Sequence, residues 1–85
     1  GINNNSQETA CKTEARTVKT AIQAFYAQET AYPTQYATAG AVKGLDGLLD
    51  SQPTGVGITY NGATTKPTLA WAGKCATAAG LPAAP

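Results

Sequence analysis

The stretch that decides the fold is NSQETACKTEARTVKTAIQAFYAQE, residues 5–29. Its main apolar residues follow one another at intervals of four, three, four and three, which places them on one side of a helix. These residues are Cys11, Ala15, Val18, Ile22 and Phe25, and Ala21 and Tyr26 are expected to widen the stripe. A helix with one apolar stripe needs a surface to cover it, so the rest of the chain is expected to supply that cover.

The predicted helix covers about residues 6–29. Asn5 or Ser6 can cap its first turn, and Asn5 with Glu8 has the spacing of a capping box. Glu8 is then expected in the first turn, where the helix dipole favours an anion, and in reach of Lys12 on the next turn. Pro33 cannot continue the helix, so residues 30–55 are predicted to form a loop. Leu45, Leu48 and Leu49 are expected to anchor that loop to the core.

A small antiparallel sheet is predicted for about residues 56–76. Residues 56–60 and 68–72 each alternate in the manner of a half-buried strand, and Asn61-Gly62 between them is a strong turn signal. Val56, Ile58 and Tyr60 are expected to share one face of the first strand, and Leu69 and Trp71 one face of the second. The fold class is therefore α+β, with a long N-terminal amphipathic helix packed on a small antiparallel sheet. A tail, residues 77–85, completes a single domain of residues 1–85.

The two cysteines, Cys11 and Cys75, are predicted to form a disulfide. Cys11 lies on the apolar stripe of the helix. If Leu69 and Trp71 face the core, strand alternation puts Cys75 on the same side of the sheet. Two residues placed independently on surfaces that should meet favour a bond, which implies an oxidising compartment. The alternative is a pair of buried free thiols in a cytosolic protein.

The inventory of side chains argues against an enzyme, so we expect no catalytic, cofactor-binding or metal-binding residues. The chain has no histidine and shows neither a glycine-rich phosphate loop nor a nucleophile motif. Asp46 and Asp50 could share a cation, but turn and cap roles explain them better. Lys12, Arg16 and Lys19 lie on one helical face, which is either a contact face for phosphates or a solvated surface. A net charge of +1 argues against a dedicated nucleic-acid or membrane-surface binder.

Three segments carry a family resemblance, namely EARTVKTAIQAFYAQ at residues 14–28, YPT at 32–34 and GITYN at 57–61. Together with the order of helix, loop and sheet, they resemble the globular domain of type IV pilins and pseudopilins over roughly residues 7–75. In that family the helix is the exposed half of a longer one. Its apolar upstream half anchors the subunit in the membrane and later forms the filament core.

The resemblance implies a structural subunit, a major or minor pilin, of an extracellular type IV pilus-like filament at the cell surface. The family's processing motif and apolar half-helix are absent from this sequence. We therefore expect a head truncated to its globular domain, or a separate globular subunit that partners a short helical pilin. Such a head would be membrane-anchored before assembly, would partner other pilin subunits through the missing helix, and would be monomeric in isolation.

Two alternatives remain open. One is a pseudopilin of a type II secretion system, which shares the fold. The other is a DNA-uptake or adhesive pilin that uses Lys12, Arg16 and Lys19 for weak contact with DNA or a surface. Steep dependence of DNA binding on salt would favour the second alternative.

Overall fold

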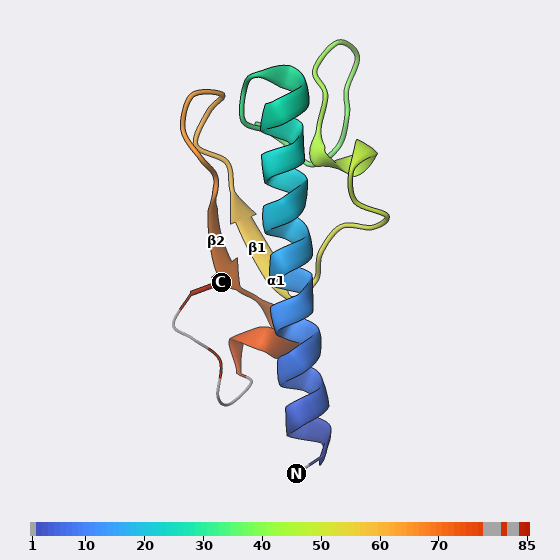
Figure 1. The fold of residues 1–85 in the computed structure, drawn as a ribbon, viewed down its shortest axis with the longest axis vertical. Helices are drawn as coiled ribbons and strands as arrows, with labels where there is room; N and C mark the ends of the chain where they lie inside the picture. Colours follow the sequence, from blue (N-terminus) through green and yellow to red (C-terminus); the bar gives the residue numbers. More distant parts are fainter. Residues whose placement is uncertain (1, 78–80, 82–83) are drawn as a thin grey trace.

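One long helix forms the spine of the molecule (Figure 1). The computed structural model describes residues 2–77, 81, 84 and 85, with residues 2–6 described by their backbone alone. The molecule extends 46 × 22 × 19 Å along its principal axes, and the helix follows the longest of them. The elements in chain order are α1 (Ile2–Glu29), the 3-10 turn η1 (Leu45–Gly47), β1 (Val56–Thr59), β2 (Thr68–Trp71) and the 3-10 turn η2 (Gly73–Ala76). The α+β class is confirmed: α1 packs on a two-stranded antiparallel sheet.

The start of α1 differs from the prediction. The helix begins at Ile2 rather than at residue 6, so Asn5 and Ser6 lie within it and occupy no cap position. Glu8 accordingly lies beyond the first turn, although its predicted ion pair with Lys12 forms, with 3.1 Å between Oε1 and Nζ. The physical reason is that no glycine or proline interrupts residues 2–29. Asn or Ser inside a helix costs less than about 1 kcal/mol relative to alanine, too little to stop it.

The predicted apolar stripe is the buried face of α1. Cys11, Ala15, Val18, Ile22 and Phe25 are all buried, and Ala21 joins them as expected. Tyr26 does not: it is 45% exposed, and its ring lies 4.6 Å from that of Tyr32. Tyr26 stands at the edge of the stripe, where a tyrosine ring can pack against a neighbour while its hydroxyl stays in water.

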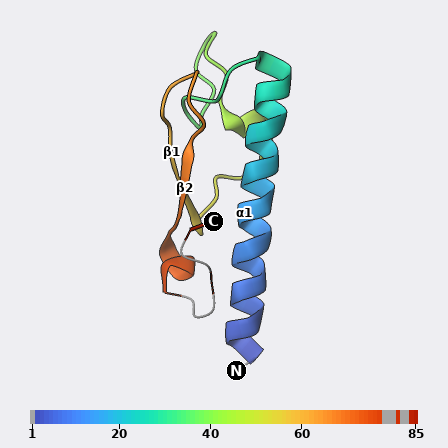
Figure 2. The ribbon, with the colours of Figure 1, turned by 60° about the vertical axis from the view of Figure 1, so that its left-hand side comes forward.

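The two strands present one apolar face to α1 (Figure 2). Val56 and Ile58 share one strand face, as do Leu69 and Trp71, both as predicted. Because Val56 lies opposite Trp71 and Ile58 opposite Leu69, all four share the inner face. Val56 is buried and the other three pack against the core from its rim, as does Tyr60 just beyond β1. The outer face, with Thr59, Thr68 and Ala70, is exposed.

The predicted sheet was too long at its C-terminal end. β2 ends at Trp71, and residues 73–76 form the turn η2 instead of a continued strand. Gly73 has a φ of +54°, a left-handed conformation that a β-strand cannot contain and that glycine adopts without steric cost. The chain therefore turns back toward α1 at this point. Of the predicted tail, residues 78–80 and 82–83 lie outside the described residues.

The loop between α1 and β1 is anchored by leucines, as predicted. Leu45 is fully buried, Leu49 is buried and Leu48 packs against the same core. Beyond this anchor, Ala39 and Val42 exchange two backbone hydrogen bonds of 2.9 Å and close a tight turn. The sheet and the loop thus lie side by side on the same face of α1, one toward each edge of its buried stripe (Figures 1 and 2). Within the described ranges, no helix combines the length and the hydropathy that crossing a membrane requires.

Candidate functional site

The predicted disulfide ties α1 to η2. The Cα atoms of Cys11 and Cys75 are 5.8 Å apart across a sequence separation of 64, and both residues are buried. The predicted pairing is confirmed, but the strand alternation on which it was based does not extend through Gly73 to Cys75. In the structure the η2 turn, rather than a strand, carries Cys75 to the helix.

Glu14 and Gly55 complete the junction around the disulfide. Oε1 of Glu14 accepts a hydrogen bond of 2.9 Å from the backbone N–H of Gly55, and the Gly55 carbonyl accepts one of 3.0 Å from the N–H of Ala72. A Cβ on Gly55 would collide with Sγ of Cys75, so a residue with a side chain does not fit there. The sequence analysis missed both residues, because their roles depend on segments 41 positions apart.

The structure gathers Lys12, Arg16 and Lys19, hereafter the cation face, on the side of α1 next to β2. All three are exposed, and they line a shallow hollow of about 210 Å³ together with Ala15, Trp71, Ala84 and Pro85. Lys12 is partly neutralised by Glu8. Among the described residues no carboxylate forms an ion pair with Arg16 or Lys19. The position of Trp71 beside this face was not predicted, since it depends on how the sheet crosses the helix.

An acidic hollow lies on the other side of α1. It has a volume of about 330 Å³ and combines the carboxylates of Glu14 and Asp50 with a buried floor at Val18 and Leu49. Glu14 accepts only the uncharged N–H of Gly55, and no ion pair within the described part of the chain involves Glu14 or Asp50. Both carboxylates therefore keep their charge available at the surface.

Asp46 has a structural role, which agrees with the turn interpretation rather than with a cation site. Its carboxylate accepts hydrogen bonds from the Thr38 hydroxyl and from the Thr38 N–H, the latter at 2.9 Å. These bonds, the side-chain bond first, hold the pKa of Asp46 below its ordinary value of 3.8. Thr38 in turn accepts a 3.0 Å hydrogen bond from the N–H of Gly44.

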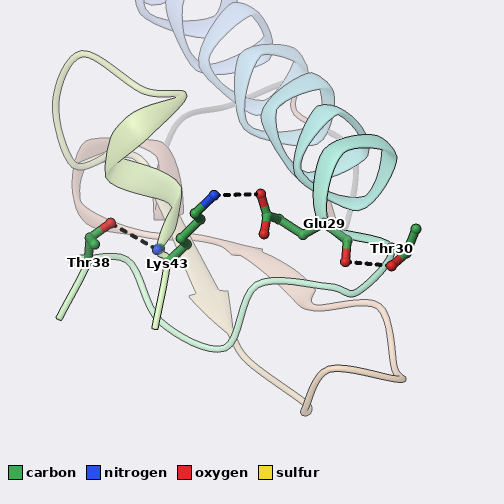
Figure 3. A network of polar contacts seen from close by, with 5 residues as sticks. Glu29, Thr30, Thr38 and Lys43 are labelled. Carbon is green, nitrogen blue, oxygen red and sulfur yellow. Dashed lines mark hydrogen bonds and ion pairs between the residues drawn. The ribbon is translucent and has the colours of Figure 1, made fainter. Parts of the chain in front are cut away.

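The same loop is tied to the end of α1 (Figure 3). Nζ of Lys43 lies 3.2 Å from Oε2 of Glu29, so the loop's base is held to the last residue of the helix. Figure 3 also shows the Thr38 hydroxyl bonded to the backbone beside Lys43. Elsewhere in the described ranges, no three acidic or cysteine side chains gather as metal ligands would. The chemistry that the surface offers is therefore charge and packing.

No family model matches this chain, and searches of curated proteins and of solved structures found no match either. The functional argument therefore depends on the geometry of the chain itself.

Proposed function

We propose that this chain is the head of a structural subunit in an extracellular, type IV pilus-like filament. The observation that carries the proposal is the projecting end of α1. The helix has 28 residues, and its N-terminal turns extend beyond the sheet and η2 (Figures 1 and 2). A helix that projects from a head can pack against helices of neighbouring subunits while the head stays on the outside.

The disulfide between Cys11 and Cys75 supports the same proposal. The disulfide fixes the sheet end to α1 close to where the helix leaves the head, so the projecting part has a rigid base. A disulfide of this kind is typical of proteins outside the cytosol. We place the mature protein on the cell surface, held in the membrane before assembly and joined to other subunits afterwards.

The experiment is deletion of the gene, followed by electron microscopy of the cell surface with antibodies against this chain. We expect thin filaments labelled along their length in the parent strain, their loss on deletion, and their return with the intact gene. Return with a gene carrying Gln23→Ala, an exposed helix position, is the matched control. If filaments persist but secretion of proteins stops, the pseudopilin alternative replaces the proposal. If both persist, the structural interpretation is wrong.

A second candidate, a pilin that binds anionic polymers, is favoured by one observation. The cation face borders the partly buried Trp71 across a hollow, and cations next to an aromatic ring suit single-stranded nucleic acid. Titration of the chain with an oligonucleotide at several salt concentrations tests this. Binding that weakens steeply with salt and is lost in Arg16→Glu supports it, whereas no binding at low salt removes it.

A further inference from the structure

We propose that copies of this chain contact one another side by side, with the cation face of one copy against the acidic hollow of the next. The inference rests on the proposed filament function and names the lateral contact between heads. Its occupant is a second copy of this chain, because Arg16 and Lys19 on one surface and Glu14 and Asp50 on the other carry opposite charges that no ion pair among the described residues neutralises.

The charges on the two surfaces are balanced. Arg16 and Lys19 are exposed cations without an ion pair among the described residues. The half-buried Glu14 and the exposed Asp50 are carboxylates without an ion pair among the same residues. Within the described residues, Lys12 pairs with Glu8 and Lys43 pairs with Glu29, so these four charges are satisfied internally. The acidic hollow, at about 330 Å³, falls at the lower end of small-ligand pockets, so it has room for one long basic side chain.

The placement of the two surfaces decides the kind of assembly. Glu14 follows Lys12 by two residues, which turns it by about 200° around the helix axis. The cation face therefore borders β2 and the acidic hollow borders the loop, on the two flanks of the helix face that sheet and loop cover. Two copies cannot engage both surfaces at once around a two-fold axis. The contact is heterologous and leaves one free surface at each end, which is the geometry that builds an open filament.

The contact is expected to be weak in isolation, because exposed ion pairs are individually worth little and are screened by salt. We expect association of the chain at about millimolar concentration in low salt, where the Debye length is about 30 Å, and its loss near 1 M salt. Sedimentation equilibrium of the chain over this range gives the association constant.

Charge reversal tests the pairing. Lys19→Glu and Asp50→Lys are each expected to weaken association at low salt by roughly tenfold, because each places like charges across the contact. The double variant Lys19→Glu with Asp50→Lys is expected to recover most of the loss, since the reversed charges face each other again. Lys66→Glu is the matched control: it makes the same change in net charge at an exposed site on the β1–β2 connection, away from both surfaces.

Three results overturn the inference. They are no association at millimolar concentration in low salt, a loss in Lys66→Glu as large as in Lys19→Glu, and failure of the double variant to recover. Tighter binding of a short single-stranded oligonucleotide to the cation face would also overturn it and assign that face to nucleic acid. The filament function is tested separately by gene deletion. If the chain associates through these charges but is absent from surface filaments, the lateral contact stands and the proposed filament function is wrong.

Discussion

At the junction around the disulfide, the backbone of Gly55 lies too close to its neighbours to accept a larger residue. Gly55 is buried, and a Cβ there would collide with Sγ of Cys75 and lie 3.0 Å from Oε2 of Glu14. We expect Gly55→Ala to destabilise the protein by about 1–3 kcal/mol, the usual cost of forcing an extra methyl group into a packed site. Urea denaturation measures the change.

Gly47→Ala is the matched control for that variant. A Cβ on Gly47 meets nothing within 4 Å, so this substitution should stay within about 0.5 kcal/mol of the parent. Equal denaturation midpoints for the two alanine variants would contradict the close approach of Gly55 to the disulfide.

Asp46 makes part of the stability dependent on pH. Because hydrogen bonds from Thr38 lower its pKa in the folded state, the carboxylate contributes stability above its ordinary value of 3.8 and loses it as the pH falls through the lower folded pKa. The difference in urea midpoint between the parent and Asp46→Asn should therefore shrink on going from neutral pH to about pH 3. A difference that stays constant over this range would show that the ionised carboxylate has no special role.

Between elements, the interface of α1 with the sheet and the leucine anchor holds the fold together. Ile22 is 1% exposed at the centre of this interface, so Ile22→Ala should cost about 2–5 kcal/mol by leaving a cavity. Gln23 is its exposed neighbour, and Gln23→Ala should change stability by less than about 0.5 kcal/mol. Thermal or urea denaturation distinguishes the two, and a similar loss for both would mean that the buried face is misassigned.

The disulfide adds a covalent link to that interface. Closing a loop of 64 residues is worth roughly 4 kcal/mol in the chain-entropy model. We expect Cys11→Ser with Cys75→Ser to lower the free energy of unfolding by about that amount. In the parent, a thiol titration of the unfolded, non-reduced protein should find no free thiol. Two reactive thiols per chain would contradict the bond.

The sequence predicts the elements whose pattern is local. Five apolar positions from Cys11 to Phe25 have one helical period, and the alternation around Ile58 and Leu69 has one strand period, so both elements and their inner faces were predictable. The first residue of α1 was not predictable, because a capping side chain contributes too little free energy to outweigh continuation of the helix. The η2 turn was not either, since the left-handed Gly73 depends on the chain folding back to α1.

The candidate surfaces were predictable only in part. The spacing of Lys12, Arg16 and Lys19 places them on one helical face from sequence alone. Two other features depend on packing between distant segments, which no local sequence pattern reveals. They are the position of the three cations beside Trp71 and the presence of Glu14 and Asp50 in one hollow.

At the scale of the whole molecule, the apolar stripe of α1 is covered by the chain's own sheet and loop. We therefore expect the chain to be a monomer by light scattering in dilute solution at physiological salt, where the lateral charge contact is screened. A tight oligomer of fixed size under these conditions would contradict the account of a head whose apolar face is already filled.

The most direct test of the central claim is mass spectrometry of filaments sheared from the cell surface, purified and digested with trypsin without reduction. We expect peptides of this chain to be a stoichiometric component. We also expect the peptide ending at Lys12 and the peptide beginning at Cys75 to appear as one disulfide-linked species. Absence of this chain from filaments of cells that express it would contradict the claim that it is a filament subunit.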